Sequence, residues 1–211
     1  MIQSPSLTVR AFAELLEAPL YEYDEKLILQ KYPNRAPAIY RIPYYREALN
    51  AIKAFFKSNR NDAVFQQAIV GIQGSTMPPE KIAHNVRVIE AFRRSAQRRR
   101  NLTVLPKRTM DASLSGVELK FTPDLSATER QTLKHVFYNF RKAAIPANVA
   151  RATLELGHWV LTQNGVSVAP SDVEFVDLFA KKVHRINRVR PQTMNRAHRN
   201  ARMVVQLWAT L

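Results

Sequence analysis

The sequence predicts an α+β protein in which a helical N-terminal half is followed by a strand-rich C-terminal half. The main observation is a change of hydrophobic period near residue 108. Before it, apolar residues recur at helical spacing, and after it they alternate as they do in strands. With 211 residues, of which 46% are hydrophobic, the chain is long and apolar enough to bury a core.

The N-terminal half contains helix signals separated by breaks. Ser6 or Thr8 is placed to cap a first helix that carries Leu15 and Leu16 on its apolar side. Residues 31–45 hold three prolines and four tyrosines, so we expect an extended connector there. Further helices are expected over residues 45–58, 61–72 and 79–97.

The C-terminal half is expected to alternate strands and helices. Residues 112–142 are predicted to form a three-stranded meander, with a polar turn before the third strand. A helix follows over residues 149–164, and Gly165 lies where a left-handed residue ends a helix at least cost. The remaining expected elements are two strands over 173–179 and 181–187 and a last helix beginning at Thr193 or Asn195.

Charge is unevenly distributed along the chain. The sequence has 32 Lys and Arg against 17 Asp and Glu, which gives a formal net charge of +15. Nine basic residues between positions 81 and 108 accompany one acid, Glu90, and no carboxylate side chain follows Asp177. Such clusters are typical of surfaces that contact phosphate backbones; a solubilising surface and an acidic protein partner are the alternatives. The residues expected to contact nucleic acid are Arg98, Arg99, Arg100, Arg141, Lys181, Lys182, Arg185, Arg188, Arg190, Arg196, Arg199 and Arg202.

Several classes of function lack their sequence signals. The chain has no cysteine, which excludes disulfides and thiolate chemistry and suits a reducing cytoplasm. Its start shows no signal-peptide pattern, and no apolar run approaches the roughly 20 residues of a membrane span. The five histidines show no metal-ligand spacing, and no phosphate-binding glycine motif occurs. We therefore expect a cytoplasmic protein with no membrane partner.

One pair of motifs carries a resemblance to a known family. Pro123-Asp124 is followed 15 residues later by Asn139-Phe140-Arg141. With the order of helices, three strands, helix, two strands and helix, this pair resembles the core of the PD-(D/E)XK nuclease-like superfamily, particularly RecB-type exonucleases and CRISPR-associated adaptation nucleases. The resemblance covers roughly residues 80–211 and implies a helical lobe over residues 1–79 and a restriction-endonuclease-like core over residues 80–211.

The resemblance also implies roles for individual residues. In that family the Asp of the Pro-Asp pair and the acid of a (D/E)-x-K motif bind magnesium, and the lysine positions the attacking water. Asp124 matches the first acid, whereas Asn139 stands in place of the second and Arg141 in place of the lysine.

Helical residues complete the family's site. A Glu or His precedes the strands in the family, and His84 or Glu90 matches that position loosely. On the following helix, Glu155 and Trp159 have the spacing of the family's Gln and Tyr but a different chemistry.

These replacements change what the site can do. Magnesium prefers anionic oxygen ligands, and Asn139 offers only a neutral carbonyl. Arg141 keeps a charge that can hold phosphate, but a guanidinium does not transfer protons as a lysine can. The sequence therefore predicts a degenerate site that keeps phosphate affinity without efficient hydrolysis. An alternative is that one of Asp111, Glu118 and Glu129 restores the second ligand in space.

Three functions follow from these readings. The first is a nucleic-acid-binding, non-catalytic subunit of a nucleic-acid-processing, mobile-element or defence system, which needs no cofactor. The second is an active magnesium-dependent nuclease with a rearranged site, and the third is a basic adaptor for an acidic protein. In the first, Arg196, Arg199 and Arg202 would present one cationic helix face; alternatively they pair with acids of the N-terminal half, such as Glu17.

Overall fold

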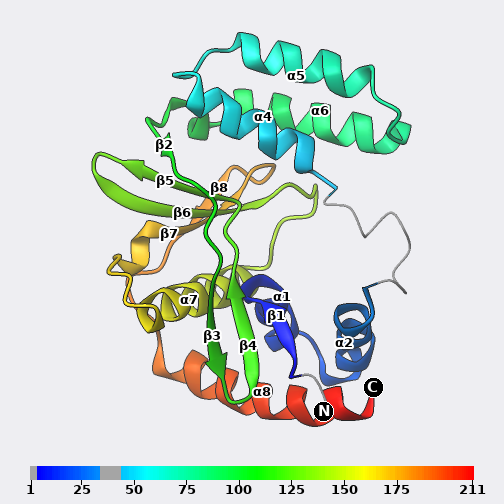
Figure 1. Cartoon of the computed structure of the whole chain (residues 1–211), viewed down its shortest axis with the longest axis vertical. Coiled ribbons are helices and arrows are strands. Elements are labelled where there is room, and N and C mark those ends of the chain that lie inside the picture. The colour runs from blue at the N-terminus through cyan, green and yellow to red at the C-terminus, as the bar shows by residue number, and fades with distance from the viewer. Residues whose placement is uncertain (1–3, 34–43) are drawn as a thin grey trace.

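The computed structural model describes residues 4–33 and 44–211 and is α+β (Figure 1). The helices are α1 (Val9–Leu16), α2 (Tyr23–Lys31), α4 (Arg46–Lys57), α5 (Ala63–Gln73), α6 (Pro79–Arg93), α7 (Ala147–Gln163) and α8 (Pro191–Thr210), with short 3-10 turns η1 (Leu20–Glu22), η3 (Ala96–Arg99) and η4 (Pro170–Asp172). The strands are β1 (Ser6–Thr8), β2 (Thr103–Val104), β3 (Met110–Leu114), β4 (Val117–Phe121), β5 (Leu125–Glu129), β6 (Thr132–Asn139), β7 (Val173–Asp177) and β8 (Lys182–His184). No helix of the described part is long and apolar enough to cross a membrane.

The strands of the described residues form two mixed sheets. One has the order β1-β4-β3, and its short edge strand β1 runs parallel to β4. The other has the order β2-β5-β6-β7-β8, in which only β6 and β7 pair in parallel and α7 is the crossover between them. Two parallel strands need such a crossover because the end of the first strand and the start of the second lie at opposite ends of the sheet.

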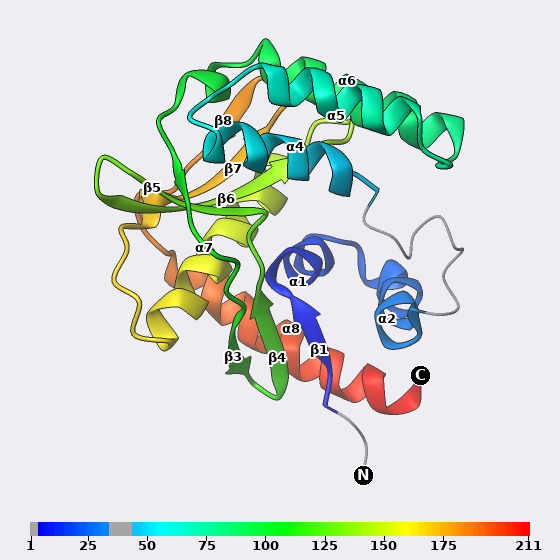
Figure 2. The same cartoon turned by 45° about the horizontal axis from the view of Figure 1, so that its top comes forward.

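The five-stranded sheet is buried on both faces. Helices α4, α5 and α6 cover one face, and α7 covers the other with α8 beyond it (Figures 1 and 2). Side chains alternate accordingly along β6: Val136 and Tyr138 join the cluster under α4–α6, and Phe137 joins the cluster around α7. Gly157 allows α7 to pack closely against the end of β4 in the other sheet as well, because a Cβ at this position would lie 2.9 Å from Phe121.

Residues 112–142 do not form the three-stranded meander expected from the sequence. They contribute to two hairpins in different sheets, β3–β4 and β5–β6. The chain leaves the first sheet at Thr122–Asp124, where Pro123 has no N–H to donate to a ladder. The expected polar turn is present at Arg130–Gln131, but the missed strand β5 precedes it.

Several local signals predicted their structure correctly. The side chain of Thr8 caps α1 by accepting a hydrogen bond from the N–H of Ala11 at 3.1 Å. Gly165 has φ +70° just beyond the end of α7, and the two strands expected after this helix are present as β7 and β8, which pair antiparallel. The last helix begins earlier than expected, at Pro191, because proline is well suited to the first helical position.

The packing of the N-terminal helices does not follow a division at residue 79. Strand β1 and helices α1 and α2 pack in one hydrophobic cluster with β3, β4, α7 and α8. Helices α4, α5 and α6 pack in the other cluster, against β5 and β6. Most of the connector expected over residues 31–45 lies outside the described residues.

Candidate nucleic-acid interface

Asp124 lies in the corner between β4 and β5, where its carboxylate occupies an open edge of β6. Its Oδ2 accepts a hydrogen bond from the N–H of Tyr138 at 2.7 Å. Nη1 of Arg10 donates a hydrogen bond to the carbonyl oxygen of Tyr138 at 3.0 Å. The Arg10 guanidinium also lies 5.3 Å from the centre of the Phe175 ring. Strand β5 begins at Leu125, opposite Val136. Asp124 and Arg10 therefore satisfy the part of β6 that β5 does not reach.

The electrostatic neighbours of the Asp124 carboxylate are cations. Burial raises its pKa, and the Tyr138 N–H, Arg10, Lys53 and Lys107 oppose that rise. The pKa of Lys53 on α4 is lowered by burial and by the charges of Lys107 and Lys57, which Asp124 opposes. The charges of Arg10, Lys53 and Lys107 therefore favour the ionised form of the carboxylate.

Sequence reasoning missed Arg10, Lys53 and Lys107. They come from α1, α4 and the segment before β3, which only the tertiary structure brings near Asp124. One signal was present for Lys53: this lysine lies four residues after Leu49 and three before Phe56, at the edge of an apolar helix face.

Asn139 lies at the end of β6, buried and opposite Asp177 of β7. Its Nδ2 donates to Asp177 Oδ2 at 3.1 Å and to the carbonyl oxygen of Ala143 at 2.8 Å. Its Oδ1 accepts from the N–H of Arg141 at 3.2 Å. The Asn139 amide therefore holds the local backbone.

Asp177 has a structural role at the ends of β6 and β7. Its side chain is buried, and Oδ2 also accepts from the N–H of Ile145 at 2.8 Å. Its Oδ1 accepts from the N–H of Ala180 at 3.1 Å.

Arg141, two residues beyond Asn139, is exposed, and no side-chain partner is found for it in the described residues.

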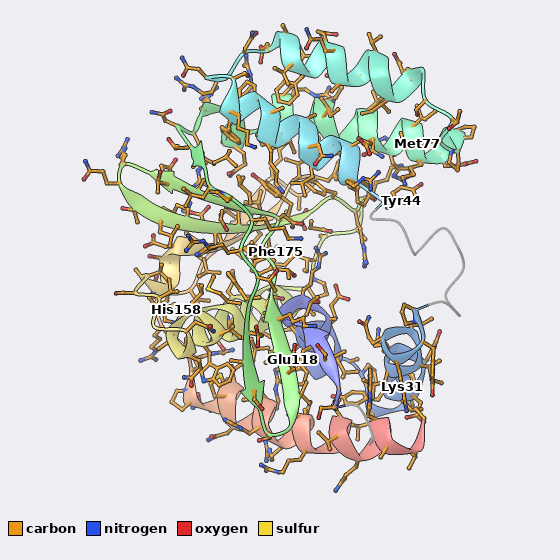
Figure 3. The ribbon with its side chains drawn as sticks, viewed as in Figure 1. Lys31, Tyr44, Met77, Glu118, His158 and Phe175 are labelled. Atoms are coloured by element: carbon orange, nitrogen blue, oxygen red, sulfur yellow. The ribbon has the colours of Figure 1, made fainter. Side chains whose placement is uncertain are left out.

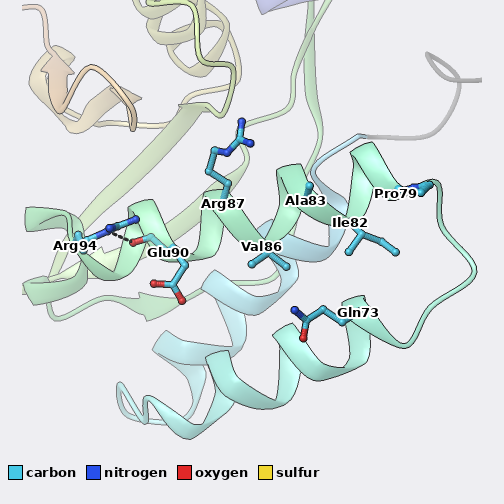
Figure 4. A pocket seen from close by; sticks show the side chains of 8 residues that line it. All are labelled: Gln73, Pro79, Ile82, Ala83, Val86, Arg87, Glu90 and Arg94. Carbon is cyan, nitrogen blue, oxygen red and sulfur yellow. Dashed lines mark hydrogen bonds between the residues drawn. The ribbon is translucent and has the colours of Figure 1, made fainter.

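The two helical candidates on α6 point in different directions. His84 and Glu90 are six residues apart, which separates their directions by about 120° around a helix. The His84 ring packs against Tyr44 and Tyr45, with centroid distances of 5.4 and 6.3 Å. Glu90 pairs with Arg93 at 3.0 Å and lines a hollow between α5 and α6, whose apolar lining includes Ile82 and Val86 (Figure 4).

Glu155 lies on α7 and is almost completely buried. Its Oε1 forms an ion pair with Nε of Arg190 at 2.8 Å, and no partner is found in the described residues for its Oε2. Arg190 also donates to the hydroxyl of Thr193 at 3.2 Å. This pair ties α7 to the start of α8, so Glu155 has a structural role between the two helices.

The residues around Asp124 do not fit a magnesium ion. Among residues 4–33 and 44–211, no three His, Asp or Glu side chains are grouped so that they could hold a metal. Of the three replacement acids, Glu118 pairs with Lys120 at 3.3 Å and Glu129 pairs with Arg100 at 2.7 Å. Asp111 is exposed on β3. None of the three is an electrostatic neighbour of Asp124.

Five of the arginines expected to contact nucleic acid are engaged in ion pairs within the protein. Their pairs are Arg98 with Asp62, Arg100 with Glu129 and Glu174, Arg185 with Glu174, Arg190 with Glu155, and Arg196 with Glu17. Arg100 is the clearest correction, because only 11% of its side chain is exposed and it bridges two carboxylates. Its pKa is raised by these partners against the effect of burial.

The other expected cations are exposed, and no ion pair is found for them in the described part of the chain. They are Arg99, Arg141, Lys181, Lys182, Arg188, Arg199 and Arg202. Arg199 and Arg202 line a polar groove of about 530 Å³ on α8, together with Gln192, Asn195 and His198. These five side chains recur at intervals of three and four residues, which places them on one helix face. Arg196 lies off this face and contacts α1 through Glu17 instead.

Comparison with known proteins adds no relative. No protein-family model matches the chain, and none of the curated proteins matches its sequence. The cations around Asp124 and along α8 are therefore the features on which a function can be based.

Proposed function

We propose that this protein binds nucleic acid through a nuclease-like fold whose catalytic site has degenerated, as a cytoplasmic subunit of a nucleic-acid-processing, mobile-element or defence system. The observation that carries the proposal is the charge around Asp124. Arg10, Lys53 and Lys107 all oppose the rise that burial causes in the pKa of this carboxylate, and Asn139 is bonded to Asp177 and to the backbone. Such a site attracts a phosphodiester but lacks the second acid that magnesium needs.

The order of elements supports the same proposal. Helix α6 precedes three antiparallel-paired strands, β2, β5 and β6, and α7 then leads to β7. This is the order of helix, three strands, helix and strand that the resemblance to PD-(D/E)XK nucleases implies, with the β3–β4 hairpin inserted after the first strand. Asp124 precedes the second of these strands, and Asn139 ends the third.

The purified protein is expected to leave linear and single-stranded DNA and RNA intact with magnesium or manganese. The physical reason is that Asp124 supplies one carboxylate and Arg141 cannot transfer a proton at neutral pH. Gel analysis of labelled substrates checks this. Cleavage that disappears in Asp124→Ala would show that the site is catalytic and would overturn the proposal of a degenerate nuclease.

Binding to the phosphate backbone of nucleic acid is expected to depend on the polar face of α8. Fluorescence anisotropy with a labelled duplex should show weaker binding by the double variant Arg199→Gln/Arg202→Gln across unrelated sequences. Each neutralised phosphate contributes about −0.9 to the slope of log affinity against log salt, so this variant should flatten the slope by about two.

Arg196→Gln is the matched control, because it removes the same charge from the same helix. Arg196 pairs with Glu17, so its loss should lower the melting temperature and leave the salt slope nearly unchanged. An unchanged slope in the double variant, or equal losses of binding in the double variant and the control, would contradict a phosphate-binding role for this face.

A further inference from the structure

Five aromatic rings form a cluster where α4, α6 and the end of β6 meet. Tyr44 and Tyr45 immediately precede α4, and their ring centroids are 5.1 Å apart in an edge-to-face arrangement. Tyr44 contacts the His84 ring at 5.4 Å, and Tyr45 contacts Phe140 at 5.6 Å. Phe140 stacks in turn on Tyr138 with an interplanar angle of 10°.

The cluster has an inner and an outer part. Phe140 and Tyr138 are buried in the hydrophobic cluster under α4–α6, and Tyr45 packs against that cluster. Tyr44 and His84 belong to neither hydrophobic cluster, and both remain partly exposed. The outer rings therefore rest on a rigid aromatic base while keeping surface available to a ligand.

The backbone beneath the outer rings is held in place by a buried amide. Asn85 of α6 is fully buried, and its Nδ2 donates to the carbonyl oxygen of Tyr44 at 3.0 Å. Its Oδ1 accepts from the N–H of Ala48, also at 3.0 Å. These two bonds join the start of α4 to α6, so the Tyr44 ring is positioned before any ligand arrives.

Two arginines lie beside the rings. Arg141 and Arg87 are electrostatic neighbours of the Tyr45 hydroxyl, and neither forms an ion pair within the described residues. Arg87 extends from α6 on the side away from α5, whereas Ile82 and Val86 point toward α5 (Figure 4). Tyr44 lies at the end of the α4–α6 layer where the ribbon of α4 starts (Figure 3).

We propose that Tyr44 and His84, flanked by Arg87 and Arg141, form a stacking platform for the bases of single-stranded nucleic acid. Aromatic rings offer any unstacked base a flat partner, and neighbouring guanidinium groups neutralise its phosphates. Duplex bases are stacked on one another and cannot reach such a platform. The inference rests on the proposed function and adds to it a preference for single strands at a site separate from α8.

The test compares two labelled probes by fluorescence anisotropy, an oligothymidylate of about 16 nucleotides and a duplex of the same length. Tyr44→Ala should bind the single strand about fivefold to a hundredfold more weakly and the duplex with unchanged affinity. Tyr44→Trp should keep the affinity, and its emission should be quenched when the single strand binds. His84→Ala and Arg141→Gln should each show a smaller loss that is confined to the single strand.

Tyr21→Ala is the matched control, because this tyrosine is 84% exposed on η1 and outside both hydrophobic clusters. It should bind both probes like the unchanged protein. Wild-type affinity for the single strand in Tyr44→Ala, or equal losses for both probes with an unchanged melting temperature, would overturn the platform alone. No binding of either probe by the unchanged protein at low salt would overturn the platform and the proposed function together.

Discussion

Replacing Arg100 by methionine is expected to lower the free energy of unfolding by about 3 kcal/mol, because it leaves the buried carboxylate of Glu174 with the more exposed Arg185 as its remaining ion-pair partner among the described residues. Glu174 of β7 is 1% exposed and accepts from Arg100 Nη1 at 2.5 Å. The same guanidinium binds both carboxylate oxygens of Glu129 on β5, at 3.0 and 2.7 Å. Arg100 thus ties the segment before β2 to two strands of the five-stranded sheet.

Urea denaturation of Arg100→Met measures this loss. Arg98→Met is the matched control, since Arg98 lies in the same basic run but pairs with Asp62 at the surface, where a pair contributes at most about 1 kcal/mol. Because Arg100 lies inside the fold, the folded fraction of Arg100→Met should bind nucleic acid as tightly as the unchanged protein. Equal stabilities of the two variants would contradict a buried structural role for Arg100.

Acidification from pH 6.5 toward pH 4 is expected to cost up to about 3 kcal/mol of stability through His135. This histidine of β6 is 3% exposed, and burial lowers its pKa from 6.5 to about 4. Its Nδ1 lies 2.9 Å from the Ser126 hydroxyl oxygen, and no partner is found in the described residues for Nε2. Between these two pKa values the unfolded chain binds a proton that the folded protein does not, so stability rises with pH across this window.

His135→Asn separates this effect from other titrations, because its side chain can still bond to Ser126. The variant should lose most of the pH dependence of the unfolding free energy between pH 4 and 6.5, whatever its absolute stability. His184, whose pKa is also lowered mainly by burial, and Asp124, whose pKa is raised by burial, titrate in both proteins and cancel in the comparison. The same pH slope in both proteins would show that His135 does not carry the effect.

The sequence determined the features that are encoded in short windows. The change of period near residue 108 predicted an α+β fold, and Thr8 and Gly165 marked helix ends through their local backbone chemistry. The sequence also singled out Asp124 after Pro123, and the structure places this residue between β4 and β5. These signals are legible because the interacting atoms lie within a few residues of each other.

The tertiary structure alone decided which charged groups meet. Arg10 and Lys53 approach Asp124 from segments more than 70 residues away in the chain, and Asn139 meets Asp177 only because β6 and β7 pair in register. Arg100 looked like its neighbours in the basic run, but Glu174 engages it. For Arg196 the sequence left two alternatives, phosphate contact or a pair with an N-terminal acid, and the structure shows the pair with Glu17. The sequence around an arginine has the same composition and the same helical spacing whether its side chain faces solvent or a distant carboxylate. Which of the two it faces is determined by the packing of the sheets and helices, because burial makes an unpaired charge too costly to leave in place.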